Sequence, residues 1–316
     1  MAVSLPISEN SLSNIEEMKK YFYLAALVLC LVSCQTEVRP KVYGRYVPER
    51  KDDFAWENEY AAFRQYGPAL APENPSNGVD LWLKNSPAPV VDTMYGRELK
   101  DHRPYHINYD GNLDCYKVGH TAGCGGVVIL ADDQLCIGGP YSRQEVLEQT
   151  ADKFVFRLEY DSVPVAGQLL QQTLTITAQA GSIWNKAEVT LRSSSQEAIE
   201  KNLFLGGGIY LHDTVDHVFQ CEKCGTVAYA EDALSDRQAA RMNYEYNGST
   251  SQGRSYIAVR TPGATRQEII DGTLVCVRPY ALGDTLTYYF AACWSEWSDG
   301  KRSFPTDEAW FEFVKK

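Results

Sequence analysis

The sequence lacks an apolar run long enough to cross a membrane as a helix. Such a helix needs about 20 apolar residues, whereas residues 21–32 form a run of only twelve. Two lysines precede this run, and it ends in the tetrapeptide Leu31-Val32-Ser33-Cys34. A basic start, a short apolar core and a small-residue cleavage site are typical of a removable export signal. Because the tetrapeptide fits a lipobox, we expect residues 18–33 to be a lipoprotein signal peptide and Cys34 to carry the lipid.

The segment before Met18 does not have the composition of an export signal. Residues 1–17 are polar and hold three acidic side chains. We therefore interpret Met18 as the true start of translation. Residues 34–46 are expected to form a tether, and residues 47–316 a single domain. This organisation predicts a cell-envelope protein, in the periplasm or on the outer surface of the outer membrane, whose only contact with the membrane is its lipid.

The predicted anchor can be tested by replacing Cys34 with alanine. We expect the Cys34→Ala protein to leave the membrane fraction and appear in the soluble fraction, because it loses its only expected membrane contact. Cell fractionation followed by mass spectrometry of the N-terminus measures both the location and the processing. Membrane-bound wild-type protein that keeps residues 1–33 would contradict the prediction.

Positive charge is scarce. The chain has 30 lysines and arginines against 41 acidic residues, and its formal net charge is −11. An acidic protein repels the phosphate backbone of nucleic acids, so no nucleic-acid partner is expected. The sequence also lacks a phosphate-binding loop, a dinucleotide fingerprint and a nucleophile elbow in a fitting context. We therefore expect no cofactor and no metal in the functional site.

Cysteines are few once the signal peptide and the lipidated residue are set aside. Seven remain, and only Cys221 and Cys224 are spaced suggestively. The pair resembles half of a zinc site, which needs four ligands. No second pair with this spacing exists, although His212 and His217 lie nearby. The alternative is a local disulfide at the tip of a hairpin.

Alternation of apolar and polar residues dominates the second half of the chain. It occurs in at least seven segments, at residues 153–163, 171–178, 187–191, 203–211, 255–260, 274–278 and 286–292. Period-two alternation with turn residues between the segments is typical of antiparallel strands in a sandwich. Residues 47–150 are interpreted as long loops between short strands, with a weak helical pattern at residues 54–66. The predicted fold is an all-β antiparallel sandwich with long N-terminal loops.

Four motifs in this N-terminal region resemble a known family. They are VPERKDDFAWEN at residues 47–58, AFRQYGPAL at 62–70, GVDLWLK at 78–84 and LDCYKVG at 113–119. In this order they are similar to exported bacterial proteins catalogued as domain of unknown function 4861. The resemblance implies a galactose-mutarotase-like supersandwich and a place among polysaccharide-degradation genes. It implies no particular activity.

The candidate catalytic residues concentrate in one glycine-rich segment, residues 101–126. His106, Tyr116 and His120 lie there, and His212 lies near the end of a predicted strand. Histidine titrates near neutral pH, and tyrosine can donate or accept a proton, so both suit acid–base catalysis. Alternatively, these residues form a well hydrogen-bonded loop without catalytic function.

The candidate substrate-binding residues are cations and tryptophans. Arg50, Arg64 and Lys117 are able to bind a carboxylate, and a guanidinium does so in a bidentate manner. Trp56 and Trp82 offer ring faces for stacking on a sugar. The alternative for this set is an ion-pair network that fixes the N-terminal segment to the sandwich.

These residues favour a carbohydrate-active enzyme, a lyase or dehydratase that performs β-elimination on uronic-acid-containing oligosaccharides. Elimination needs a cation or hydrogen-bond donors at the carboxylate, a base and an acid. Two other functions stay open. One is a non-catalytic glycan-binding protein, and the other is a glycoside hydrolase with paired carboxylates drawn from Asp53, Glu57, Asp80 and Asp114.

Overall fold

The computed structural model describes residues 40–108, 111–193, 199, 201–212, 217–233, 252–297 and 303–316. The predicted signal peptide and Cys34 lie outside these residues. The described chain from Pro40 onward forms a single unit. Within the described residues, no helix is long and apolar enough to span a membrane.

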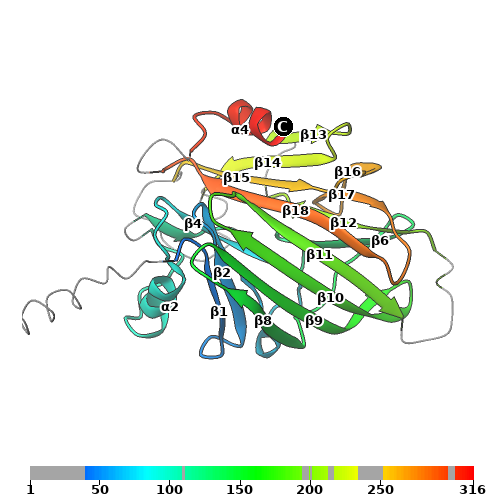
Figure 1. The fold of residues 1–316 in the computed structure, drawn as a ribbon, viewed down its shortest axis with the longest axis horizontal. Coiled ribbons are helices and arrows are strands. Elements are labelled where there is room, and N and C mark those ends of the chain that lie inside the picture. Colours follow the sequence, from blue (N-terminus) through cyan, green and yellow to red (C-terminus); the bar gives the residue numbers. More distant parts are fainter. Residues whose placement is uncertain are drawn as a thin grey trace, which may run out of the picture. The chain divides into compact units, whose positions relative to one another are not determined.

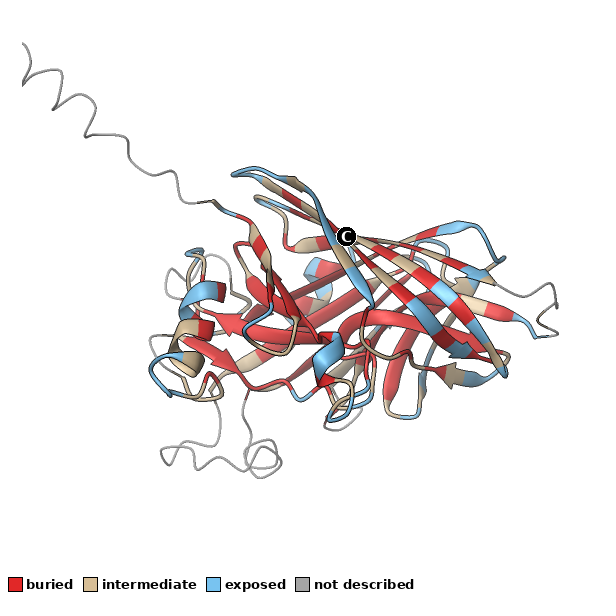
Figure 2. Cartoon of the chain, turned by 90° about the horizontal axis from the view of Figure 1, so that it is seen from below, coloured by how far each residue is buried: buried red, intermediate tan, exposed pale blue. Residues whose placement is uncertain are grey.

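Alternating side chains build the largest sheet. In β9 (Lys153–Val165), β10 (Gln168–Gln179) and β11 (Trp184–Ser193), successive residues turn alternately toward the core and toward solvent, as the strand pleat requires (Figure 2). These strands lie in an eight-stranded antiparallel sheet (Figure 1). Its order is β13 (Val218–Cys221), β14 (Thr226–Asp232), β15 (Arg254–Arg260), β18 (Thr285–Trp294), β11, β10, β9, β8 (Arg143–Gln149).

A second, five-stranded sheet packs on the first. Its order is β16 (Arg266–Ile270), β17 (Thr273–Pro279), β12 (Leu203–Tyr210), β6 (Cys124–Ala131), β7 (Gln134–Cys136). The glycines of β12 permit a close approach between the sheets: a Cβ at Gly207 would lie 2.7 Å from the ring of Tyr288 in β18.

A third sheet is formed by the N-terminal region. Its strands follow chain order: β1 (Tyr43–Val47), β2 (Asp53–Glu57), β3 (Ala61–Gln65), β4 (Val79–Lys84), β5 (Asn112–Asp114). The helical pattern at residues 54–66 was therefore a wrong prediction. Phe54 and Phe63 share a face because they lie on adjacent strands, β2 and β3, and not on successive turns of a helix. The predicted tether also ends earlier than expected, since β1 begins at Tyr43.

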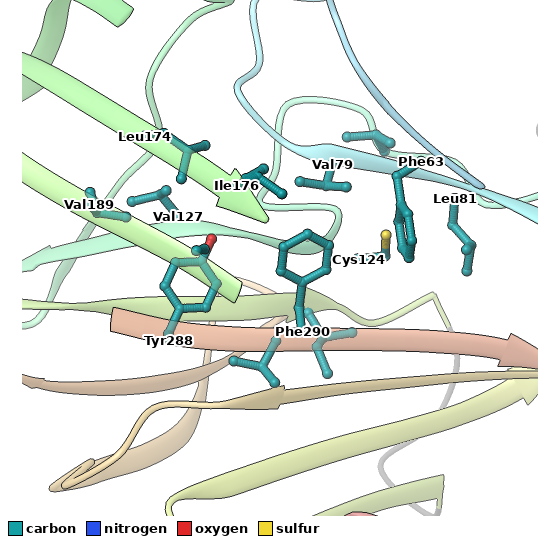
Figure 3. Packing of buried hydrophobic residues seen from close by; sticks show 14 of the residues in the cluster. Phe63, Val79, Leu81, Cys124, Val127, Leu174, Ile176, Val189, Tyr288 and Phe290 are labelled. Carbon is teal, nitrogen blue, oxygen red and sulfur yellow. The ribbon is translucent and has the colours of Figure 1, made fainter. Parts of the chain in front are cut away.

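The three sheets share one core. Figure 3 shows Phe63 and Leu81 of the third sheet, Cys124 of the second and Phe290 of the eight-stranded sheet in the same cluster. The rings of Phe63 and Phe290 meet edge to face with centroids 5.4 Å apart. An isolated bridge between residues 79 and 123 joins the third sheet to the second. The predicted all-β antiparallel fold is confirmed.

Short helices complete the described chain. They are the 3₁₀ turn η1 (Pro68–Leu70), α2 (Val91–Leu99) and α4 (Asp307–Val314). Helix α2 covers the face of the third sheet that points away from the shared core. Helix α4 is capped by the preceding Thr306, whose hydroxyl accepts a hydrogen bond from the backbone N–H of Ala309, a standard N-cap.

Cys221 and Cys224 are joined by a disulfide at the hairpin between β13 and β14. This settles the two alternatives for the pair in favour of the local disulfide. Within the described part of the chain, no three His, Cys, Asp or Glu side chains are placed to hold a metal ion.

Candidate functional site

A cleft of about 460 Å³ opens where the third sheet meets the segment that leads into β6. We call it the first cleft. It is lined by five of the residues that the sequence singled out, namely Arg64, His106, Tyr116, Lys117 and His120. Tyr66, Asn74 and Asp114 also line it. The structure thus brings together residues from two regions of the sequence that were predicted to converge.

Strand pairing places a row of charged residues along one side of the first cleft. Asp80 lies directly opposite Arg64 in the pairing of β3 with β4. Asp114 lies opposite Trp82 in the pairing of β4 with β5. Since side chains of directly paired residues point to the same face, the arginine and both carboxylates gather on the side of the sheet that α2 covers.

The guanidinium of Arg64 is already occupied by the protein. Its Nε donates to Asp80 Oδ2 at 2.8 Å, and its Nη2 donates to the same carboxylate and to Asp114 Oδ2 at 3.1 Å. Its Nη1 donates to the hydroxyl of Tyr105 at 2.9 Å. The prediction that Arg64 clamps a substrate carboxylate is therefore wrong, because internal acceptors already use its donors. Arg64 instead fixes Asp114 at the cleft wall.

Asp80 and Asp114 titrate far above the usual range of a carboxyl group. Burial, followed by repulsion from Asp114, raises the pKa of Asp80 to about 7. Burial also raises the pKa of Asp114 to about 7, against the opposing attraction of Arg64. Two buried carboxylates beside one guanidinium therefore retain a proton near neutral pH. Asp114 is the one of the two that lines the first cleft.

His106 lies beside Asp114. Its Nδ1 is 3.1 Å from the backbone carbonyl oxygen of Asp114 and 3.5 Å from the carboxylate Oδ2. A carbonyl oxygen only accepts, so Nδ1 carries a hydrogen and donates it, which leaves the lone pair of the neutral ring on Nε2. Burial lowers the pKa of His106. At neutral pH the ring is therefore mostly uncharged and suited to take up a proton.

Tyr116 lines the first cleft with its ring, but its hydroxyl points away from solvent. The hydroxyl lies 2.6 Å from the carbonyl of Tyr210 and 3.1 Å from that of Gly123. Burial raises the pKa of Tyr116 well above its usual value. The prediction that Tyr116 is a catalytic acid or base is wrong, because its proton is directed to backbone carbonyls.

His212 lies outside the first cleft. Its side chain is 2% exposed, its Nδ1 is 3.0 Å from Glu231 Oε2, and its Nε2 is 2.7 Å from the backbone carbonyl of Lys117. Its predicted catalytic role is wrong, since both ring nitrogens contact protein oxygens in a buried place. By bonding the Lys117 carbonyl, His212 positions the wall that carries Lys117 and His120.

Replacing His212 should destabilise the fold. In His212→Gln we expect the free energy of unfolding to fall by about 1–3 kcal/mol, the usual cost of leaving a buried hydrogen-bonding group unsatisfied. Chemical denaturation measures the change. His217→Gln is the matched control, because His217 also pairs with a carboxylate but its side chain is 34% exposed. Equal losses of unfolding free energy in the two variants would show that the stabilisation by His212 does not depend on its burial.

The remaining predicted binding residues do not reach the first cleft. Trp56 and Trp82 are fully buried, so the prediction that they stack on a sugar is wrong. Trp56 donates from Nε1 to Asn185 Oδ1 across to the eight-stranded sheet. Trp82 packs against the ring of Tyr105. Arg50 donates to the Tyr105 hydroxyl at 3.2 Å and is not among the residues that line the first cleft.

Tyr66 is a cleft residue that the sequence reasoning missed. Its hydroxyl has no hydrogen-bond partner among the described residues, and its ring lies beside the guanidinium of Arg64 at 5.2 Å. No strand pattern signals this role, since Tyr66 follows the end of β3 at Gln65. Its hydroxyl is available to contact a ligand in the first cleft.

Comparisons with known proteins give a family but no activity. The chain is 23% identical over 282 residues to the uncharacterized protein P7 of Formosa agariphila, covering 87% of this chain and 66% of that relative. It therefore spans slightly less than two thirds of the relative's length. A solved structure also matches, the galactosidase domain of the alpha-galactosidase-sucrose kinase AgaSK. The match covers 79% of this chain and 41% of the solved chain, with 8% sequence identity and a TM-score of 0.32. The model of the domain of unknown function DUF4861 matches residues 31–316, and the chain belongs to this family.

Proposed function

We propose that the protein is a carbohydrate-active enzyme that performs β-elimination on uronic-acid-containing oligosaccharides in the first cleft. The observation that supports this proposal is the contact between His106 and Asp114. A histidine that is neutral at pH 7 and a carboxyl group that is partly protonated there form an acid–base pair suited to proton transfer.

His106 is the base in this proposal. Its Nε2 removes the proton on the sugar carbon next to the substrate carboxylate, and the C–H electrons form a new C=C bond. The ammonium of Lys117, which is exposed on the cleft wall, neutralises the carboxylate as negative charge develops. His120, also exposed at the cleft mouth, supplies a further hydrogen bond to the sugar.

The leaving group receives its proton from Asp114, the other member of the acid–base pair. As the C=C bond forms, the bond from the β carbon to the glycosidic oxygen breaks, and that oxygen needs a proton. Asp114 supplies it from its protonated form, because its pKa is raised to about 7, and Arg64 stabilises the resulting carboxylate. Proton and electron counts balance: His106 gains one proton, the leaving oxygen gains another, and no oxidant or reductant is needed.

Hydrolysis by paired carboxylates is less well supported. Of the four carboxylates that the sequence offered, only Asp114 lines the first cleft. Glu57 is buried, pairs with Lys84 at 2.6 Å and accepts hydrogen bonds from the N-terminus of α2. Asp80 contacts the same nitrogen of Arg64 as Asp114 does. These positions do not flank a glycosidic bond from two sides, as the paired mechanism requires.

The proposal is tested by incubating the protein with a panel of uronate oligosaccharides. We expect ultraviolet absorbance from a conjugated C=C bond, with product masses that add up to the substrate mass. Products heavier by one water molecule would instead show hydrolysis. Binding without any product would favour the glycan-binding alternative. If the protein neither binds nor turns over any oligosaccharide of the panel, the proposed uronate ligand is refuted.

A further inference from the structure

A larger hollow adjoins the first cleft. It measures about 900 Å³ and is lined by the turn between β6 and β7, the turn between β9 and β10, and the start of β17. We call it the second cleft. His120 lines both clefts. Because they share His120, the two clefts are neighbours, and a ligand longer than one sugar ring that occupies the first cleft extends toward the second.

The walls of the second cleft are tight hairpin turns. Asp132, Ala166 and Asp271 adopt left-handed backbone angles, with φ of 54°, 49° and 48°, and each lies at a turn that lines the cleft. Such turns between paired strands are geometrically fixed by the hairpin. Because the strands on either side belong to the sheets, the cleft is largely pre-formed, which lowers the entropic cost of binding.

The lining has both apolar and polar parts. Leu135, Ile137 and Pro164 supply aliphatic surface, and Gln134 and Asp271 supply hydrogen-bonding groups. A sugar ring has the matching character, since its C–H faces are apolar and its hydroxyls donate and accept hydrogen bonds. A concave surface that combines apolar patches with placed polar groups is usual for a small-molecule site.

The charges of the second cleft favour an uncharged ring. Lys201 is the only lysine or arginine among its described lining residues, and its ammonium is paired with Asp132 at 2.8 Å. Asp133 is paired with Arg266 at 2.9 Å, whereas Asp271 forms no ion pair within the described part of the chain. An anionic sugar would therefore meet repulsion without a cation to compensate for it.

We infer that the second cleft binds a neutral sugar unit of the same oligosaccharide whose uronate lies beside His106. This inference rests on the proposed function, which fixes how the oligosaccharide is oriented across the two clefts. The enzyme then prefers an oligosaccharide in which a neutral sugar neighbours the uronate over a uronate disaccharide or a polymer of uronates alone. The carboxylate of Asp271 accepts hydrogen bonds from the hydroxyls of the neutral ring.

The test compares wild type with Asp271→Asn on a tetrasaccharide with alternating uronate and neutral sugars and on the matching disaccharide. We expect wild type to have a kcat/KM at least about tenfold higher on the tetrasaccharide, the value of one charge-assisted hydrogen bond. Asp271→Asn should lose about this factor on the tetrasaccharide and keep its kcat/KM on the disaccharide. Asparagine also tolerates the left-handed backbone. Asp284→Asn, in an exposed turn that lines neither cleft, should change neither value.

Equal kcat/KM for the two substrates in wild type, or an equal loss on both in Asp271→Asn, would overturn the inference and leave the proposed elimination intact. If no uronate is turned over, the proposed function fails, and calorimetric binding then decides the inference by itself. Weaker binding of the tetrasaccharide by Asp271→Asn than by wild type supports it. Equal binding, absent binding or a preference for a uronate-only tetrasaccharide overturns it.

Discussion

Replacement of Arg64 by methionine should lower the free energy of unfolding by about 3–5 kcal/mol, the usual cost of removing one partner from a buried ion pair. Methionine keeps much of the aliphatic volume but none of the charge. Asp80 and Asp114, both almost fully buried, would lose their shared hydrogen-bond donor. Chemical denaturation at about pH 9 measures the loss, because both carboxyl groups, with pKa values of about 7, are ionised in folded wild type there.

The control for this variant is Arg143→Met. Arg143 also forms a bidentate contact with a carboxylate, Asp161, but its side chain is 61% exposed. An exposed ion pair contributes about 0–1 kcal/mol, so the control should change little. Similar losses in the two variants would show that Arg64 does not stabilise the row of buried carboxylates.

The loss of unfolding free energy in Arg64→Met, here called its deficit, should also shrink as the pH is lowered. In wild type, the pKa values of Asp80 and Asp114 are raised to about 7 in the folded state. Without the attraction of Arg64 both pKa values rise further. Keeping the two groups ionised in the folded state therefore costs the most free energy at high pH. The unfolded chain titrates alike in the two proteins, so its carboxyl groups cancel from the comparison. As the pH falls below about 7, folded wild type also protonates both groups, and the electrostatic part of the deficit disappears.

Replacement of His106 by asparagine should reduce kcat on a uronate oligosaccharide by about 10²–10⁴-fold, the usual contribution of a placed acid–base group. Asparagine keeps a donor toward the Asp114 carbonyl but cannot take up a proton. The matched control is His102→Asn, since His102 is exposed in the same segment and does not line the first cleft. An unchanged kcat in His106→Asn would remove His106 from the mechanism.

The same pair of groups predicts a bell-shaped pH profile. Activity should fall on the acidic side when His106 becomes protonated, at a pH below the ordinary value for histidine because burial lowers its pKa. Activity should fall on the alkaline side, above about pH 7, when Asp114 loses its proton. In His106→Asn the acidic limb should vanish while the alkaline limb stays.

The sequence predicted the cleft residues better than their roles. Histidines and a lysine in a glycine-rich segment did converge, because this segment passes from the third sheet to the second beside the end of β3. The number and identity of internal partners could not be predicted. Arg64 was expected to bind a substrate carboxylate, but two aspartates distant in sequence already occupy its donors.

The error on the tryptophans has a related cause. Trp56 and Trp82 lie in β2 and β4, where every side chain is buried. A strand that is covered on both faces has no alternation from which exposure can be inferred. In β9 to β11, by contrast, one face meets solvent, and the period-two pattern located the strands correctly.

The buried thiols make the unfolding of each sheet separately observable. Cys124, Cys276 and Cys293 lie in β6, β17 and β18 and are fully buried, whereas Cys221 and Cys224 are tied to each other. A thiol reacts with an alkylating reagent only after the structure around it opens. Mass spectrometry of the labelled peptides therefore reports an opening rate for the second sheet and one for the eight-stranded sheet. Equal rates would mean that the two sheets unfold as one cooperative unit.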